Sequence, residues 1–223
     1  MSDAVIEVCD LGFSYPDGTR ALNGVSFSLA RGEAVALIGA NGAGKSTLLL
    51  HLNAYLSPTR GALRVGGRPV TKASAPAVRR TVGVVFQDPD DQLFMPTVLE
   101  DVAFGPLNAG LAPEAARQVA ERALARVGMS HVASRPPYKL SAGEKRAVAI
   151  ASVLALEPDV LVMDEPSSNL DPRGRRRLIG LLKSFGHTRL IATHDLELVV
   201  EVCPRVLVMD GGRIVADGPT ADL

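Results

Sequence analysis

Tryptophan is absent from this sequence of 223 residues, and aromatic residues together make up only 4% of it. A stretch of about 18 apolar residues is lacking too, so the sequence predicts no transmembrane helix. Positive and negative side chains balance, with 24 of each, and no basic tract indicates a nucleic-acid partner. The first residues contain neither a positively charged segment nor an apolar segment, so we expect no signal peptide.

Cysteine is scarce as well: Cys9 and Cys203 are the two thiols, and they lie far apart in the sequence. Each is surrounded by apolar residues, and we interpret both as reduced core residues of a cytosolic protein. Hydrophobic residues form 47% of the sequence and charged residues 22%, which is the balance of an ordinary globular protein. This length and composition fit one large domain, or a core with a subdomain.

One glycine-rich segment, residues 39–47, matches the pattern G-x-x-x-x-G-K-[ST] at every position. An apolar run at 34–38 precedes it and predicts a buried strand, and residues 48–52 are expected to open a helix. Glycines let such a loop bend and bring backbone N–H groups close to a phosphate, and the helix N-terminus adds partial positive charge. A chance glycine-rich turn is the disfavoured alternative, because strand, loop and helix occur in the required order.

This segment therefore predicts a nucleotide-phosphate site. We expect Lys45 to reach the β- and γ-phosphates and the Ser46 hydroxyl to ligate Mg²⁺. The other residues expected to bind the nucleotide here are Gly39, Asn41, Gly42, Ala43, Gly44 and Thr47.

Two acids follow a second apolar run, residues 160–163, which also predicts a buried strand. Asp164 is then placed to hold Mg²⁺, directly or through water, and Glu165 to act as general base on the attacking water. The simpler interpretation is a core strand that ends in two solvated acids. Beside the glycine-rich segment, we prefer the hydrolytic one.

Two further polar residues end predicted strands. His194 follows the apolar residues 190–192 and Thr193, and it is expected to bond the γ-phosphate or the water held by Glu165. Gln87 follows Phe86, and its amide is expected to reach Mg²⁺ or water and to sense the γ-phosphate. For His51, His131 and His187 we expect surface or packing roles.

Ser141 and Glu144 form a capping-box pattern at the start of a predicted helix that continues through residues 147–150. A well-capped helix is a sufficient explanation of this pattern. The functional alternative is that Ser141 and the Gly143 N–H face an anion, and the spacing alone does not say which anion.

The order of these motifs resembles the nucleotide-binding subunit of ATP-binding-cassette (ABC) transporters, over essentially the whole chain. The resemblance implies Tyr15 as an aromatic adenine platform, Gln87 as the Q-loop and residues 140–144 as the signature. It also implies Asp164 and Glu165 as Walker B, residues 168–171 as the D-loop, and His194 as the switch histidine.

The resemblance further implies a fold and an assembly. We expect a RecA-like P-loop NTPase core with an antiparallel β subdomain, formed by residues 1–88 and 158–223, and a helical signature subdomain at 89–157. Two copies would sandwich two ATP molecules head to tail, with the signature of one copy at the γ-phosphate held by the other. ATP would close this pair and hydrolysis would open it.

The signature departs from the family pattern Leu-Ser-Gly-Gly-Gln, because Ala142 and Glu144 replace a glycine and the glutamine. A carboxylate beside a phosphate is unfavourable. If Glu144 bonds the Ser141 N–H instead, it points away from ATP. We still count Ser141, Gly143 and Glu144 among the residues expected to bind nucleotide.

Residues 86–94 and 98–106 look like the ATPase of energy-coupling-factor (ECF) transporters. Within that group, the compact length and residues 144–146 and 171–175 look most like the subunit for cobalt or nickel. This implies peripheral attachment to the cytoplasmic face of the cell membrane through integral transmembrane and substrate-binding subunits, which would bind the transported metal. Asp88, Asp90 and Asp91 form either a solvated acidic loop or a contact for arginines of a membrane partner.

Three alternatives stay open. One is the ATPase of a vitamin (for example biotin) or other ABC importer. Another is a soluble ABC ATPase that acts on DNA or ribosomes, although the chain has no long insertion or basic linker. The third is a degenerate regulator that only binds nucleotide, although Lys45, Asp164, Glu165 and His194 are all present.

Overall fold

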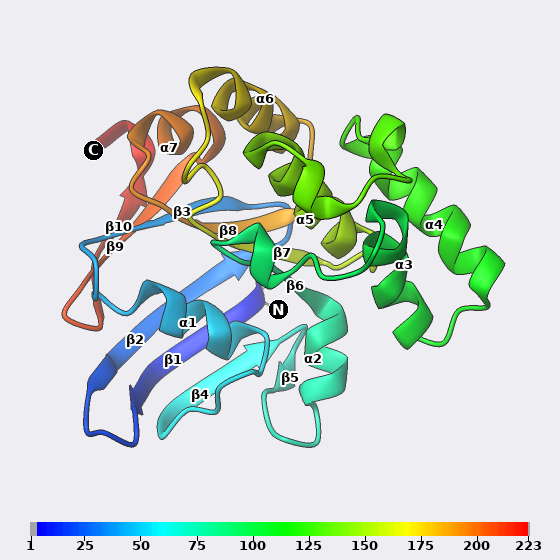
Figure 1. The fold of residues 1–223 in the computed structure, drawn as a ribbon. Helices are drawn as coiled ribbons and strands as arrows, with labels where there is room; N and C mark the ends of the chain where they lie inside the picture. Colours follow the sequence, from blue (N-terminus) through cyan, green and yellow to red (C-terminus); the bar gives the residue numbers. More distant parts are fainter. Residues whose placement is uncertain (1–3, 223) are drawn as a thin grey trace. The chain divides into compact units, whose positions relative to one another are not determined.

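The computed structural model describes residues 4–222, which separate into two compact units. The core unit comprises the residues up to Val84, Asp159–Glu165 and the residues from Gly186 onward. The helical unit comprises Val85–Pro158 and Pro166–Phe185. Figure 1 labels the elements of both units.

A six-stranded sheet forms the centre of the core unit. Its strand order is β10 (Arg213–Pro219), β9 (Arg205–Asp210), β3 (Ala34–Ile38), β8 (Thr188–Ala192), β7 (Val160–Asp164) and β6 (Val82–Val85). Strand β3 runs parallel to both β8 and β9, and β7 runs parallel to β8, whereas β10 is antiparallel to β9. The middle strands are buried along almost their whole length, which explains their uninterrupted apolar sequences.

A second sheet in the core unit has four strands in the order β2 (Arg20–Ala30), β1 (Ala4–Ser14), β4 (Arg60–Val65) and β5 (Arg68–Pro69). The pairs are antiparallel. Gly66 and Gly67 join the last two strands with φ values of 56° and 75°. A tight hairpin turn requires positive φ at both positions, which glycine adopts without steric cost.

Three helices belong to the core unit: α1 (Lys45–Leu52), α2 (Ala75–Thr81) and α7 (Leu196–Val202). Helix α1 contacts β2 of one sheet and β7 of the other (Figure 1). One hydrophobic cluster therefore joins Leu11 and Leu63 of the antiparallel sheet, Leu48 of α1, and Leu37 and Val162 of the parallel sheet. This shared core fixes the position of the glycine-rich loop, which immediately precedes α1.

The helical unit contains α3 (Val98–Asn108), α4 (Pro113–Arg126), α5 (Ala142–Leu154) and α6 (Pro172–Lys183), with 3₁₀ turns at Pro89–Asp91, Ser130–Val132 and Pro137–Lys139. A fourth 3₁₀ turn, Thr220–Asp222, follows β10 in the core unit. Helices α3, α4 and α5 contact one another, and α5 also contacts α6. The Thr97 hydroxyl accepts the Glu100 N–H at the start of α3. Pro113 begins α4, and Gly128 follows its end with a φ of 73°.

The strands and helices predicted from apolar runs and capping patterns are present in the structure, with ends that differ by a few residues. Helix α2 and strand β10 were not predicted. The two thiols are free, and Cys203 is buried as expected, but the expectation for Cys9 is wrong because this residue is exposed. Cys9 follows the buried Val8 along β1, so its side chain points to the opposite face of the sheet.

Within residues 4–222, every helix is too short or too polar to cross a lipid bilayer.

Candidate nucleotide-binding and hydrolysis site

The glycine-rich loop connects β3 to α1 in a conformation that requires glycine at two points. A Cβ atom at Gly39 would lie 2.1 Å from the Met209 carbonyl oxygen. Gly44 has a φ of 103°, and a Cβ atom there would lie 2.4 Å from the Ala21 carbonyl oxygen. The backbone of β9 and β2 therefore packs directly against the loop. At Gly42, by contrast, a Cβ atom would meet no described atom within 4 Å, so the loop is open on that side.

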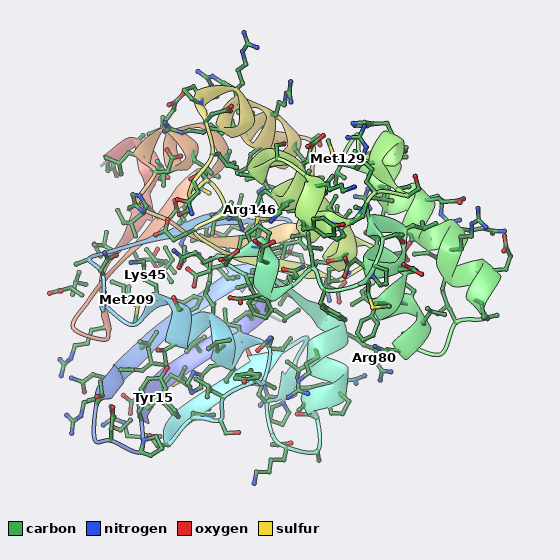
Figure 2. The ribbon with its side chains drawn as sticks, viewed as in Figure 1. Tyr15, Lys45, Arg80, Met129, Arg146 and Met209 are labelled. Carbon is green, nitrogen blue, oxygen red and sulfur yellow. The ribbon has the colours of Figure 1, made fainter. Side chains whose placement is uncertain are left out.

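Lys45 is the first residue of α1 and is only 7% exposed. Its Nζ atom donates hydrogen bonds to the carbonyl oxygens of Gly39, at 2.8 Å, and Ala40, at 3.1 Å. The ammonium group is thus held over the loop that it follows, as the labelled position beside Met209 shows in Figure 2. None of the described side chains caps the start of α1, so the loop presents backbone donors and one cation on the same side.

Asp164 ends β7 and is hydrogen-bonded to the Ser46 hydroxyl at the start of α1. Burial raises the pKa of Asp164, and that hydrogen bond and the nearby Lys45 charge oppose the rise. A hydroxyl and a carboxylate are oxygen ligands of the kind that Mg²⁺ takes together with phosphate oxygens. Residues 4–222 contain no cluster of three or more acidic, histidine or cysteine ligands. The oxygen atoms of Ser46 and Asp164 are suited to Mg²⁺ that is shared with a phosphate.

Glu165 and His194 lie in contact at the ends of two neighbouring parallel strands, β7 and β8. The Oε2 atom of Glu165 is 2.9 Å from Nδ1 of His194 and 3.3 Å from its backbone nitrogen, which donates to it. The Glu165 side chain is 10% exposed and that of His194 is 75% exposed. A buried carboxylate beside a histidine that faces solvent can take a proton from water.

Tyr15, in the loop after β1, lies beside the phosphate loop. Its hydroxyl is 3.0 Å from that of Thr47, and its ring meets the Phe13 ring edge to face at 5.0 Å. The Phe13 ring also contacts His51, and the two ring centroids lie 4.7 Å apart. His51 is completely buried, and its Nδ1 atom is 2.8 Å from the Thr47 carbonyl oxygen.

In the helical unit, Ser141 and Glu144 form the capping box that the sequence predicts. The Glu144 carboxylate accepts from the Ser141 N–H and hydroxyl, both at 2.8 Å, and the Ser141 hydroxyl accepts the Glu144 N–H at 3.4 Å. These two bonds from Ser141 lower the pKa of Glu144. The carboxylate is therefore turned back onto the start of α5. Gly143, next to it, is only partly exposed.

Gln87 follows β6, and its carbonyl group is held by α5. Arg146 donates 2.7 Å hydrogen bonds to the carbonyl oxygens of Phe86 and Gln87. Gln92 reaches the same helix through the Ala149 carbonyl oxygen and the Ser152 hydroxyl, and Lys145 lies 2.6 Å from Asp90. The acidic loop at 88–91 thus has a cationic partner within the chain at Asp90.

The core unit brings together Tyr15, the glycine-rich loop, Asp164, Glu165 and His194, and the helical unit carries Gln87 and the capping box. Two buried side chains near these groups, His51 and Arg146, belong to no nucleotide-binding or catalytic motif in the sequence. His51 lies four residues after Thr47, the spacing that places a side chain over the preceding helical turn. Arg146 lies on the same helix as the capping box, and a buried arginine in an apolar stretch is the signal that could have drawn attention to it.

The family model described as ABC transporter matches residues 22–168 of this chain, from the second strand to just beyond Asp164 and Glu165. The chain belongs to the ABC transporter family. It is an ATPase of the ABC type that binds ATP with Mg²⁺.

Curated relatives place it more closely. The chain is 60% identical over 100% of its length, and 90% of the relative's, to a putative ABC transporter ATP-binding protein of Geobacter sulfurreducens. It is 49% identical to the energy-coupling factor transporter ATP-binding protein EcfA of Methanocaldococcus jannaschii, covering 96% of this chain and 78% of the relative.

Solved structures confirm the expected fold of this ABC ATPase. CbiO1 from Clostridium perfringens, part of the ABC transporter complex cbiONQ, matches with a TM-score of 0.90 and 40% identity, over 99% of this chain and 90% of that one. The ATP-binding cassette MJ0796, a dimer in a post-hydrolysis state bound to ADP and Pi, matches with a TM-score of 0.86 and 25% identity, over 96% and 98%.

Proposed function

We propose that this ABC ATPase powers a membrane importer of the energy-coupling-factor class and that the transported substrate is cobalt or nickel. The observation that carries the hydrolytic part is the buried Glu165 carboxylate, held beside Asp164 and in contact with His194. The ECF class is supported by the identity to EcfA, and attachment to a transporter complex by the likeness to cbiO1 of the cbiONQ complex. The metal rests on the resemblance of residues 144–146 and 171–175 to the cobalt or nickel subunit.

The residues divide the work of hydrolysis among them. Backbone N–H groups of residues 39–44 and the Lys45 ammonium bind the phosphates, and Asn41 in the loop and Thr47 in α1 also contact the nucleotide. Tyr15 supports the adenine. Ser46 and Asp164 hold Mg²⁺, with Gln87 contributing an amide oxygen, and the ion neutralises charge on the phosphates when bound. Glu165 takes the proton from the attacking water. His194 contacts the Glu165 carboxylate and keeps it aligned with the γ-phosphate.

The proposed assembly contains a second copy of the chain, integral membrane subunits and a substrate-binding subunit, at the cytoplasmic face of the membrane. The dimeric likeness to MJ0796 supports the pair, and the complex that contains cbiO1 supports the membrane subunits. Ser141 and Gly143 at the start of α5 then serve the γ-phosphate held by the second copy. Residues 1–88 and 158–223 form the proposed nucleotide-binding core with its antiparallel β subdomain. Residues 89–157 form the proposed helical signature subdomain.

The second candidate is an ECF importer of a vitamin such as biotin, which the identity to EcfA supports equally. Action on DNA or ribosomes is disfavoured by the zero net charge.

The test is a pull-down of the tagged chain from detergent-solubilised native membranes, with bound partners identified by mass spectrometry. We expect a small membrane scaffold together with a metal-binding membrane subunit. Recovery of a vitamin-binding subunit would support the ECF class but overturn the proposed metal substrate. Recovery of two ordinary permease subunits would overturn the assignment to the ECF class. A Lys45→Ala chain serves as the matched bait, because it keeps the partner surfaces and alters only the nucleotide site.

A further inference from the structure

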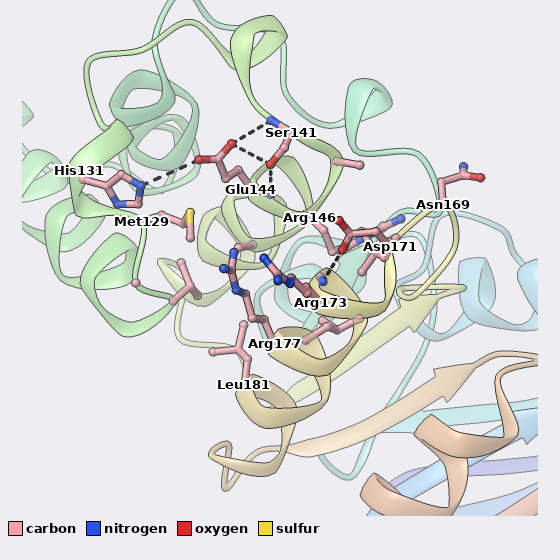
Figure 3. Close-up of a pocket in the computed structure, with 18 residues that line it drawn as sticks. Met129, His131, Ser141, Glu144, Arg146, Asn169, Asp171, Arg173, Arg177 and Leu181 are labelled. Atoms are coloured by element: carbon pink, nitrogen blue, oxygen red, sulfur yellow. Dashed lines mark hydrogen bonds and ion pairs between the residues drawn. The ribbon is translucent and has the colours of Figure 1, made fainter.

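A cavity of about 830 Å³ lies within the helical unit, between α5, α6 and the segment 127–131 (Figure 3). Small-molecule sites in proteins commonly have volumes between about 300 and 1,000 Å³. The residues assigned above to nucleotide binding contribute only one edge of this cavity, through Ser141, Gly143 and Glu144. The rest of the lining has no role in the reaction described so far.

Two arginines on α6 supply the positive charge of the cavity. Arg173 and Arg177 are one helical turn apart, both are exposed, and both line the cavity. Figure 3 shows their guanidinium groups projecting from α6 toward Met129 and Glu144. Among residues 4–222, neither guanidinium has a hydrogen-bond or ion-pair partner. Each guanidinium can therefore donate to a carboxylate or a similar acid group.

The acids of the lining are already engaged. Asp171 caps α6 and accepts the Gly174 N–H at 2.6 Å. Glu144 is held by the two bonds from Ser141. A third arginine, Arg146, is 2% exposed, and its Nε atom lacks a partner in the described part of the chain. Three arginines against two committed carboxylates leave the cavity with one net positive charge.

The remaining surface of the cavity is largely apolar. Val127 and Leu178 are buried and form part of the wall, and Met129 and Leu181 are partly exposed to it. An inorganic anion would use the arginines and leave this apolar surface in contact with water. A ligand with an acid group and a hydrocarbon or aromatic body would bury both parts.

We propose that this cavity binds a small amphipathic organic anion. The acid group lies against Arg173 and Arg177, and the apolar body lies against Met129 and Leu181. Because Ser141 and Asn169–Asp171 also line the cavity, an occupant contacts the signature and the D-loop from the side of α6.

The test uses the amphipathic sulfonate 8-anilinonaphthalene-1-sulfonate (ANS) as probe, with its fluorescence titrated against the whole chain. We expect saturable binding, and we expect the double variant Arg173→Ala/Arg177→Ala to raise the dissociation constant by at least about tenfold. The matched control is Arg122→Ala, an exposed arginine of α4 that does not line the cavity. Met129→Gln tests the apolar part independently, because it makes the side chain polar without adding charge, and it is also expected to weaken binding.

Competition separates the two features of the ligand. Decanoate should displace ANS, whereas decanol and inorganic phosphate at the same concentration should not. Lys45→Ala should bind ANS like the parent chain. The proposal is overturned if the double arginine variant binds as tightly as the parent, if decanol competes as well as decanoate, or if Lys45→Ala loses the probe.

Discussion

The Nδ1 atom of His194 lies 2.9 Å from Oε2 of Glu165, although the histidine side chain is mostly exposed and the glutamate side chain is buried. The backbone of Glu165 is fixed beside β8, because its N–H donates to the Ala192 carbonyl oxygen at 2.8 Å. Its φ of 45° is uncommon for a residue with a side chain and costs about 1–3 kcal/mol. Such strain at the end of a buried strand is typical of residues placed for chemistry.

Replacing Glu165 with glutamine should abolish most ATP turnover while ATP binding persists. Glutamine keeps the size of the side chain but removes the proton acceptor, and general-base catalysis contributes about 10²–10⁴-fold. Phosphate release and binding of radiolabelled ATP would be measured on the same preparation. We also expect the variant to accumulate as an ATP-bound dimer in size-exclusion chromatography.

The matched control is Glu114→Gln, which removes an exposed carboxylate from the first turn of α4 and should leave turnover unchanged. Phosphate release at the parent rate in Glu165→Gln would remove Glu165 as the base.

Replacing Glu144 with glutamine should leave ATP hydrolysis within a few-fold of the parent rate. The carboxylate is bonded to Ser141, and a glutamine oxygen can accept the same N–H. The kcat and KM for ATP would be measured for both chains. A change of about a hundredfold would instead mean that residue 144 acts on the nucleotide directly.

The same capping box predicts a pH-dependent contribution to stability. The pKa of Glu144 in the folded chain lies below its ordinary value of 4.5, because Ser141 bonds the charged form. This contribution is present above that ordinary value and is lost as the pH falls through the lowered pKa. Ser141→Ala should cost about 0.5–2 kcal/mol of unfolding free energy at neutral pH. Urea denaturation should show a smaller difference from the parent in acid, and a constant difference would contradict this account.

The sequence predicted where several candidate residues of the core unit lie, because their motifs are local. A strand, a glycine-rich turn and a helix follow one another within residues 34–52, so their spacing fixes the loop conformation. The strands that deliver Asp164 and His194 are buried on both faces and appear as plain apolar runs. Parallel pairing of β7 and β8 then places Glu165 and His194 at the same edge of the sheet.

Features that depend on contacts between distant segments could not be predicted in this way. Nothing near Arg146 in the sequence indicates that it bonds the carbonyl oxygens of residues 86 and 87, because these lie about sixty residues earlier. Strand β10 is largely exposed, so its sequence lacks an apolar run. Cys9 was misplaced because an apolar neighbourhood does not reveal to which face of a strand a side chain points.

His51 should make stability fall as the pH drops below neutrality. Burial lowers its pKa below the ordinary 6.5, so the folded chain resists protonation that the unfolded chain accepts. Stability is therefore fully present above that value and declines as the pH falls through it. Urea denaturation from about pH 7.5 to about pH 5.5 should show this loss in the parent and a shallower slope in His51→Gln.

The control for this slope is Gln118→Ala, which alters an exposed, uncharged side chain of α4. It should keep the slope of the parent, and an equally reduced slope in both variants would exclude His51 as the source. His51→Gln should also raise the KM for ATP more than it lowers kcat. The reason is that His51 supports Phe13 and the Thr47 carbonyl beside Tyr15, not the reacting atoms.

Asp101 should be more sensitive to alanine than to asparagine. One carboxylate oxygen accepts the N–H groups of Phe94 and Met95, and the other is buried without a partner in the described residues. Burial raises the pKa of Asp101. Alanine leaves two N–H groups unsatisfied, at about 1–3 kcal/mol for a buried group, whereas asparagine keeps the acceptor and removes the buried charge. Equal losses of unfolding free energy in the two variants would contradict this.

The two thiols should react with a disulfide reagent at very different rates. Cys9 is exposed, whereas burial raises the pKa of Cys203 to about 12 and leaves almost no thiolate near neutral pH. With 5,5′-dithiobis(2-nitrobenzoic acid), the native chain should release one equivalent of thionitrobenzoate quickly and the second only in denaturant. Cys9→Ser should remove the fast phase and leave the slow one. Fast reaction of Cys203 in that variant would mean that the segment between α7 and β9 opens readily in the native protein, against the burial that the structure assigns to it.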